Sequence, residues 1–177
     1  VAAKRNSDSI VEVVSSEDLG KLPEQSVAES LARLPGVTGQ RGASGRTDFI
    51  SIRGLAPKFG GAVMNGREMV SSNDGRAVEF DQFPSELVNS LVVYKTPDAA
   101  LVGQGLSGTV DIRTLKPLDL RSRQVSINLN GATNSNNTPV AGGGSTVGKR
   151  ASMSYVDQFA DNTIGVSLGY AHLDSPA

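Results

Sequence analysis

The N-terminal part of the chain alternates short helical and extended hydrophobic patterns, separated by clear turn residues. Val27, Leu31 and Leu34 recur at helical spacing within a polar segment, which predicts an amphipathic helix. Pro23 is its expected start and Gly36 its expected stop. Short extended runs predict strands at residues 10–14, 49–54, 62–66, 90–95 and 109–114. These elements together favour a small mixed α/β sheet.

After Pro117 the pattern becomes a plain period-two alternation of apolar side chains with small or amide side chains. It occupies three segments, residues 124–130, 151–156 and 164–173. Neither face of these segments carries Lys, Arg, Asp or Glu, whereas a soluble antiparallel sheet usually places charges on its solvated face. The pattern therefore favours transmembrane β-barrel strands over a soluble sheet, which remains the alternative at this point.

Composition narrows the classes of function. The net charge is -1 with both signs interspersed, so the chain has no basic field for nucleic acid. Cysteine is absent, which excludes disulfides, thiolate metal sites and a Cys nucleophile. His172 is the only histidine, so a zinc site or a His-paired nucleophile is hard to build. We therefore expect no nucleic-acid partner, no metal, no cofactor and no catalytic residue.

Two glycine motifs invite an enzyme interpretation. Residues 103–108, GQGLSG, match a dinucleotide-binding fingerprint, but the TVDIRT segment after them is typical of a strand, whereas the fingerprint must open a helix. Residues 143–150, GGSTVGKR, nearly match a phosphate-binding loop, but Arg150 replaces the hydroxyl residue that would hold magnesium. Both motifs are interpreted as loops.

The order of motifs resembles the N-terminal part of TonB-dependent outer-membrane receptors over nearly the whole chain. The matching segments are LARLPGV (31–37), ISIRGL (50–55), VMNGREM (63–69), FPSELVNSLVVYKTP (83–97) and GQGLSGTVDIRTLKP (103–117). The resemblance implies an α+β fold, with a small mixed-sheet plug domain and short helices at residues 1–118. Residues 119–177 would then form the first antiparallel strands of a transmembrane β-barrel. The NGREM, YKTP and DIRTLKPLD segments look most like the proteobacterial carbohydrate-uptake branch.

The resemblance implies an energy-gated importer in the outer membrane of a Gram-negative cell. The plug would bind a scarce substrate, either an oligosaccharide, a siderophore or a cobalamin. A TonB-type energy-transducing protein would remodel the plug, and outer-membrane lipid would surround the barrel. The resemblance also implies a TonB-binding strand upstream of the plug, and we expect it to be cut away or degenerate because none is evident before Ile10. The alternative function is a soluble periplasmic α/β binding or adaptor domain.

Particular residues acquire roles from the same resemblance. Arg53 matches a plug arginine that pairs with barrel glutamates, and Lys95 occupies the position of a second one, so both are expected to anchor the plug. Ordinary surface cations are the alternative for this pair. Three loops, at residues 40–47, 56–61 and 71–76, would contact the substrate, with Arg41, Lys58, Phe59, Asn73, Asp74 and Arg76 as the candidates. The alternative is that these are simply turn residues.

Overall fold

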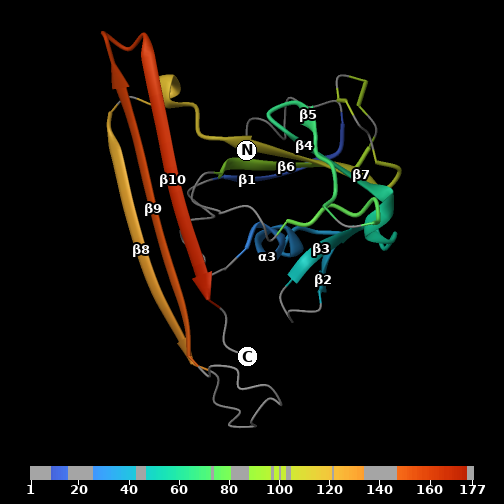
Figure 1. Cartoon of the computed structure of the whole chain (residues 1–177). Coiled ribbons are helices and arrows are strands. Elements are labelled where there is room, and N and C mark those ends of the chain that lie inside the picture. The colour runs from blue at the N-terminus through green and yellow to red at the C-terminus, as the bar shows by residue number, and fades with distance from the viewer. Residues whose placement is uncertain are drawn as a thin grey trace. The chain divides into compact units, whose positions relative to one another are not determined.

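The computed structural model describes residues 9–15, 26–42, 47–72, 74–80, 88–96, 98–99, 101–102, 105–120, 122–133 and 147–174. The chain divides into two compact units, Val1–Leu115 and Lys116–Ala177, which are described separately below (Figure 1). The sequence places the domain boundary after Leu118, and that boundary remains a prediction.

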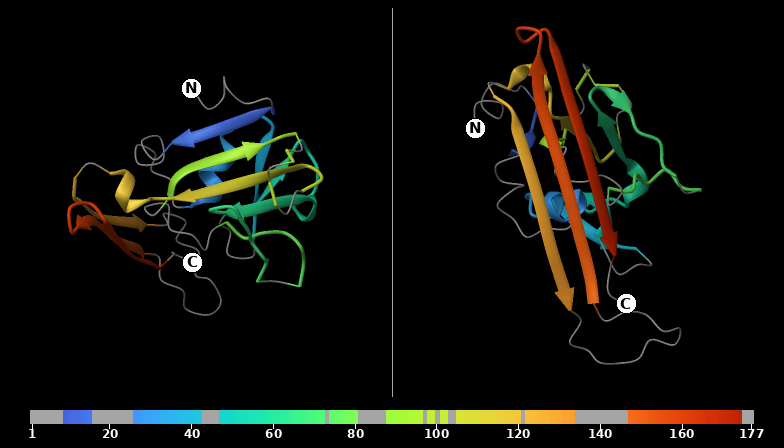
Figure 2. Two further views of the ribbon diagram at one scale, coloured as in Figure 1. Left: turned by 90° about the horizontal axis from the view of Figure 1, so that it is seen from above. Right: turned by 60° about the vertical axis from the view of Figure 1, so that its left-hand side comes forward.

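The first unit contains a five-stranded mixed sheet, confirming the predicted fold class (Figures 1 and 2). Its strands β4 (Gly60–Met64) and β7 (Gly108–Thr114) run parallel, and every other neighbouring pair is antiparallel. All five strands predicted for this part of the chain exist, with ends within two residues of those expected. The sheet order is β1 (Val11–Ser15), β6 (Val88–Tyr94), β7 (Gly108–Thr114), β4 (Gly60–Met64) and β5 (Arg67–Glu68).

The predicted amphipathic helix is present as α3 (Val27–Ala32), but it begins later than Pro23. Ser26 has an extended backbone, with φ -143° and ψ 158°, and its hydroxyl accepts a hydrogen bond from the Glu29 amide at 3.4 Å. Ser26 is therefore the N-cap, with Glu29 three residues later as in a capping box. No helix in the described part of the chain is long and apolar enough to cross a membrane.

The core of this unit lies between the five-stranded sheet and a layer made of α3 with a two-stranded sheet (Figure 1). That second sheet pairs β2 (Val37–Arg41) with β3 (Thr47–Ile52) in antiparallel register. Strand β2 was not predicted, because only its first residue is buried and the rest of it is polar and exposed. Fully buried side chains from both layers include Leu31, Ile52, Leu91, Val93, Val110 and Ile112.

A tight hairpin joins β4 to β5 at Asn65 and Gly66, which have φ values of 51° and 80°. Both conformations are left-handed, which Asn and Gly tolerate best. The Asn65 side chain also fixes the hairpin to β7, because its Oδ1 accepts from the Thr114 amide at 3.0 Å. Its Nδ2 donates to the Thr114 hydroxyl at 2.9 Å.

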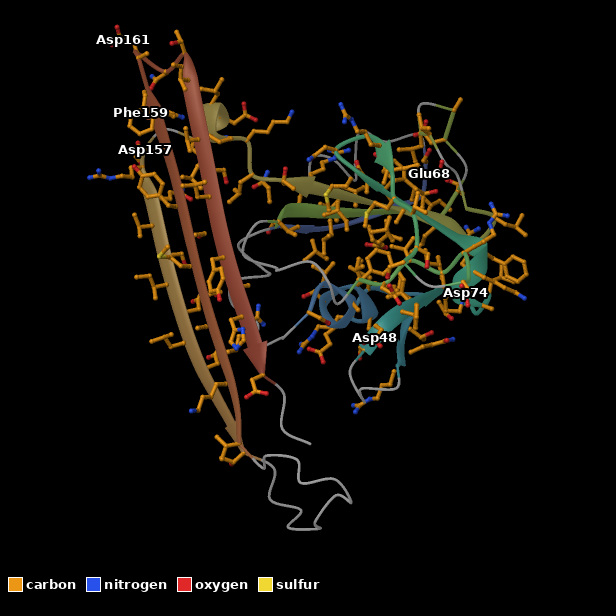
Figure 3. All side chains as sticks on the ribbon, viewed as in Figure 1. Asp48, Glu68, Asp74, Asp157, Phe159 and Asp161 are labelled. Atoms are coloured by element: carbon orange, nitrogen blue, oxygen red, sulfur yellow. The ribbon has the colours of Figure 1, made fainter. Side chains whose placement is uncertain are left out.

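The second unit is a three-stranded antiparallel sheet in the order β10-β9-β8. A short 3-10 helix, η3 (Pro117–Asp119), precedes β8 (Gln124–Thr133), β9 (Val147–Phe159) and β10 (Ile164–Asp174). The β9–β10 connection is a compact turn in which Ala160, Asp161 and Asn162 all have positive φ; Figure 3 labels Asp161 there. The side-chain Nε2 of Gln158 ties β9 to η3 and the residue after it by donating to the carbonyls of Pro117 and Leu120.

The alternation in this second sheet leaves a set of large apolar side chains exposed, as the barrel interpretation predicts. Along the central strand β9, Ser152 and Ser154 are only 3% and 7% exposed. Large apolar side chains on the alternate positions are exposed, namely Val125, Ile127, Leu129, Met153, Leu168 and Tyr170. The buried face of β9 carries Ser152, Ser154 and Val156, and the exposed apolar positions lack the charges that a soluble sheet places on its solvated face, which fits strands that face lipid.

Candidate functional site

A pocket of about 230 Å³ opens in the first unit, where the short 3-10 helix η1 (Pro57–Phe59) leads into β4. Side chains and backbone from four separate stretches of the chain line it. We call it the Lys58 pocket, and it is lined by Lys58, Phe59, Gly60, Gly61, Ala62, Glu68, Met69, Arg76, Val78, Gly105 and Leu106.

The floor of the Lys58 pocket is a close crossing of two backbones, which only glycine permits. A Cβ on Gly105 would lie 2.1 Å from the Gly61 nitrogen and 2.5 Å from the Gly60 carbonyl carbon. The Ser107 amide donates to the Phe59 carbonyl at 3.0 Å, which holds the two stretches together. The Gly105 amide donates to the Thr109 hydroxyl at 3.1 Å. The GQGLSG segment therefore has a structural role in forming this floor.

The rim of the Lys58 pocket carries charge and one aromatic ring. The Lys58 ammonium lies 5.3 Å from the centroid of the Phe59 ring, within cation–π range. Phe59 is 40% exposed, and Glu68 and Arg76 are exposed beside the same pocket (Figure 3 labels Glu68). Within the described part of the chain, no ion pair joins the charged groups of this rim.

The structure brings together three of the six predicted substrate contacts. Lys58, Phe59 and Arg76 share the Lys58 pocket, although they come from two of the predicted loops. Arg41 and Asp74 are exposed but do not line this pocket. Asn73 lies outside the described residues.

Several other residues line the pocket that the sequence pattern did not predict. Glu68, Met69 and Leu106 line the Lys58 pocket together with the predicted residues. Glu68 had a usable signal, because it lies two residues after the Asn65-Gly66 turn, where the hairpin pairs it with Val63 on β4. Leu106 had none, since only the glycine crossing brings it there.

Arg53, one of the two predicted anchors, lies in a turn just after β3 rather than inside a strand. Its φ is 55° and that of Gly54 is 73°, so both residues are left-handed. The Arg53 amide donates to the Gly36 carbonyl at 2.8 Å, which ties this turn to the end of the helical segment. The Arg53 side chain is exposed.

Lys95, the other predicted anchor, has a partner within the first unit. Its ammonium lies 3.4 Å from Glu12 Oε1 on β1, and the two side chains are only 11% and 15% exposed. Backbone contacts surround this pair, because the Lys95 amide donates to the Ile10 carbonyl at 2.8 Å. The Ile10 amide donates to the Thr96 hydroxyl at 3.0 Å. This set of contacts fastens the edge strand β1 to the end of β6.

Strand β7 carries a further ion pair, between Arg113 and Asp111. These two residues alternate with the core residues Val110 and Ile112, so their side chains lie on the opposite face of the sheet. Arg113 Nε donates to Asp111 Oδ2 at 2.7 Å, and Arg113 Nη2 donates to the Tyr94 hydroxyl at 3.3 Å. The hydrogen bond to Asp111 raises the pKa of Arg113, which keeps the guanidinium charged. Sequence reasoning gave this group no role.

The alternatives raised by the glycine motifs and by histidine find no supporting geometry. Gly108 begins strand β7, so the GQGLSG segment does not open a helix there. Residues 147–150 of the second motif belong to β9, and its remaining residues lie outside the described part. His172 is exposed on β10. The described residues contain no cluster of three potential metal ligands.

The first unit is thus a small mixed-sheet domain with a polar surface pocket, and antiparallel strands with an outward apolar face follow it. The sequence profile of the TonB-dependent Receptor Plug Domain matches residues 3–110. This match covers more than half of the chain, so the chain belongs to the TonB-dependent receptor plug family. The family places it in the outer membrane.

Individual relatives agree with this family. The chain is 32% identical over 117 residues to the probable TonB-dependent siderophore receptor PirA of Acinetobacter baumannii, covering 56% of this chain and 15% of the relative. It is 30% identical over 100 residues to the vitamin B12 transporter BtuB of Photobacterium profundum, covering 56% and 16%. These relatives are receptors or transporters rather than enzymes, and they give no support to the carbohydrate-uptake branch.

A solved structure shares the fold over almost the whole chain. The ferric citrate transporter FecA in its unliganded form matches with a TM-score of 0.74 and 16% identity. The match covers 97% of this chain and 26% of FecA. At that level of identity the likeness supports the fold, including the antiparallel strands that follow the mixed sheet.

Proposed function

We propose that this chain is the plug of an active-transport receptor, which binds a scarce substrate and gates its import into the periplasm. A TonB-type energy-transducing protein supplies the energy by remodelling the plug, so the mechanism needs no catalytic residue and no cofactor. Outer-membrane lipid is the other partner. The observation that carries the proposal is the plug-family match over residues 3–110, on a unit with a closed core and an open polar pocket.

The proposed substrate contacts are the six residues named from the sequence, with Lys58, Phe59 and Arg76 as the central group. Their shared pocket supports this choice, because an exposed cation, a ring and a guanidinium can together hold a polar ligand. The relatives are named for siderophores and vitamin B12, which makes these two classes candidates. The NGREM, YKTP and DIRTLKPLD segments keep an oligosaccharide as the third candidate.

Arg53 and Lys95 are the proposed anchors between plug and barrel. The exposed side chain of Arg53 favours this role. Lys95 would have to exchange Glu12 for a barrel carboxylate, since the two already form a largely buried ion pair. A buried charge that loses its partner is costly, so this exchange requires a replacement carboxylate nearby.

Uptake measurements in paired strains test the proposed function. Cells that produce the full-length protein are given a siderophore, cobalamin or oligosaccharide as their only source of the nutrient, with and without an active TonB-type protein. We expect uptake of one of these substrates to require both proteins. Equal uptake with and without TonB for every substrate would refute the importer and favour the soluble periplasmic alternative.

A second measurement tests the substrate contacts. Combining Lys58→Ala with Arg76→Ala should weaken binding of the imported substrate, while hydrogen exchange across β6 and β7 stays unchanged. Unchanged affinity in this variant would remove the Lys58 pocket from the proposal.

A further inference from the structure

We infer that the second unit binds the headgroup of one phospholipid at Arg123, Tyr155 and Asp157, which together we call the Arg123 site. The headgroup that fits is a zwitterion with a phosphate and a primary ammonium, as in phosphatidylethanolamine. The inference rests on the proposed function, because it requires these strands to belong to a barrel in the outer membrane. It goes beyond general lipid contact, since it assigns one headgroup chemistry to one end of the sheet.

The Arg123 site lies on the exposed apolar face of the sheet. Gln124 pairs with Val156. Arg123 directly precedes β8, so one more step of the same register places it opposite Asp157. Tyr155 lies two residues before Asp157 on β9 and therefore on the same face. Side chains opposite each other in an antiparallel pair have Cβ atoms about 5 Å apart, so a cation, an anion and a phenol hydroxyl are neighbours here. The large apolar side chains exposed on this face include Val125, Ile127, Leu129, Met153, Leu168 and Tyr170.

The carboxylate of Asp157 is held in place before any lipid binds. Its Oδ2 accepts from the Tyr155 hydroxyl at 2.7 Å, and its Oδ1 accepts from the Gln158 backbone amide at 2.8 Å. Each carboxylate oxygen keeps a further lone pair for another donor. The acceptor for a lipid ammonium is therefore fixed in position.

Arg123 supplies the cation of the site. Its side chain is exposed and interacts electrostatically with both Tyr155 and Asp157. Among the described residues, however, it takes part in no ion pair. Guanidinium donors in a planar fork match phosphate geometry, so Arg123 can accept the phosphate of a headgroup without first breaking an ion pair.

The position of the site along the strands fits a headgroup layer. It lies at the end of the sheet that carries the compact β9–β10 turn, where Figure 3 labels Asp157. On this face of β9 the next charged residue is Lys149, eight residues away. That separation is about 27 Å along the strand, and about 20 Å across the bilayer for a strand tilted by about 40°. The uncharged band between them is comparable to the apolar band of about 25 Å in outer-membrane barrels, whose short turns face the periplasm.

The charges of the site match a zwitterion better than an anion. Arg123 and Asp157 carry one charge of each sign. A primary ammonium can donate hydrogen bonds to Asp157, whereas the quaternary ammonium of choline has no N–H donor. A glycerol headgroup is anionic and offers no cation to Asp157. The short ethanolamine bridge between phosphate and ammonium suits two side chains that face each other across a strand pair.

The side chains next to the site continue the same contact. Phe159 is 47% exposed and lies two residues beyond Asp157 on the same face, so its ring can contact the ammonium through a cation–π interaction. In the opposite direction along the strands, Met153 and Ile127 are 51% and 65% exposed. These apolar side chains can contact the acyl chains of the lipid whose headgroup lies at the Arg123 site.

Lipid titrations on the full-length protein test this inference. Native mass spectrometry of the protein in detergent measures the binding of phosphatidylethanolamine, phosphatidylcholine and phosphatidylglycerol with identical acyl chains. We expect the ethanolamine lipid to bind about threefold or more tightly than either of the others, which is the size expected for an exposed charge contact. Equal binding of all three lipids would overturn the inference.

Two substitutions separate the two halves of the site. Asp157→Asn should weaken only the ethanolamine lipid and so remove the preference, because only that headgroup donates to the carboxylate. Arg123→Gln should weaken all three lipids by about threefold, because each contains a phosphate, and Arg123→Lys should restore most of this loss. Equal weakening of all three lipids by Asp157→Asn would contradict the assignment of the ammonium to this carboxylate.

Asp161→Asn is the matched control. Asp161 is exposed in the β9–β10 turn, close in sequence to Asp157 but outside the site, and its φ of 52° suits asparagine as well as aspartate. We expect this variant to keep the ethanolamine preference. A loss equal to that of Asp157→Asn would show a general charge effect and overturn the inference.

Hydrogen exchange and uptake separate the remaining outcomes. The β9 amides should exchange alike in the wild type and in Asp157→Asn. A preference that is lost only together with faster β9 exchange would show a structural role for this carboxylate and overturn the lipid site. If TonB-dependent uptake persists without any lipid preference, the importer stands and this inference fails alone. If the full-length protein inserts into no bilayer, the proposed function fails with it.

Discussion

The two units of this chain bury opposite faces of similar strands. In the first unit, Leu91 on β6 is 0% exposed, within a core shared by two layers. In the second unit, Leu129 on β8 is 75% exposed, while Ser152 on the neighbouring strand is buried. Period-two alternation alone therefore does not determine which face is inside. On the proposed barrel, lipid rather than water would contact the exposed apolar side chains of the second unit, so the medium would decide which face is buried.

Two leucine truncations give the largest expected contrast between the units. Leu91→Ala should lower the free energy of unfolding of the first unit by about 2–5 kcal/mol, because it removes a fully buried side chain and leaves a cavity. Leu129→Ala removes the same atoms from an exposed position and should not affect the first unit. The effect of each variant on the first unit is measured by hydrogen exchange of the β6 and β7 amides in the full-length protein. Similar exchange in the two variants would contradict the core described for the first unit.

A pair of glycines gives the next largest contrast. A Cβ at Gly105 would lie 2.1 Å from the Gly61 nitrogen, whereas nothing lies within 4 Å of a Cβ at Gly131 on β8. Gly105→Ala should therefore destabilise the first unit by about 1–3 kcal/mol through overpacking, and it should also distort the Lys58 pocket. Gly131→Ala should leave hydrogen exchange in the first unit unchanged. Normal stability in Gly105→Ala would mean that the backbone crossing is looser than described.

Much of this fold follows from local pattern. The five strands predicted in the first unit and the Asn65-Gly66 hairpin obey alternation and turn chemistry, so the sequence predicts them within two residues. Strand β9 instead extends four and three residues beyond its predicted ends at 151 and 156. The start of α3 was wrong, because Pro23 was preferred over the Ser26 and Glu29 capping box. Strand β2 was missed because it is paired but mostly exposed, and therefore has no apolar alternation.

The site is less predictable than the fold because its contacts are distant in sequence. Lys58, Phe59 and Arg76 were named from loops, yet their meeting in one pocket depends on the Gly105 crossing. The ion pair of Lys95 with Glu12 joins residues 83 positions apart, and no local pattern announces it. The sequence therefore indicates which side chains are candidates for the site, but not which residues distant in sequence they contact.

Breaking the Glu12–Lys95 ion pair should produce a smaller effect, confined to strand β1 of the first unit. Glu12→Gln leaves the nearly buried Lys95 ammonium without its carboxylate, which should cost about 1.5 kcal/mol. The β1 amides should then exchange roughly tenfold faster, with no change in β9 or β10. Adding Lys95→Met removes the orphaned charge and should recover part of the loss, as a double-mutant cycle would show. Unchanged β1 exchange in Glu12→Gln would argue that backbone pairing alone holds this strand.

The smallest contrast compares two turns with the same strain. Asn65 in the first unit and Ala160 in the second both have φ 51°. Ala160→Gly should stabilise the β9–β10 turn by about 0.5 kcal/mol, since relief of left-handed strain exceeds the added entropy of the unfolded chain. Asn65→Gly should instead destabilise by about 1 kcal/mol, because it removes the hydrogen bonds to Thr114. Hydrogen exchange of two amides measures these effects. The Thr163 amide donates to the Ala160 carbonyl and reports the β9–β10 turn, and the Thr114 amide donates to Asn65 Oδ1 and reports the β4–β5 hairpin. Effects of the same sign would mean that backbone strain dominates in both turns, and that the Asn65 side chain does not fasten the hairpin to β7.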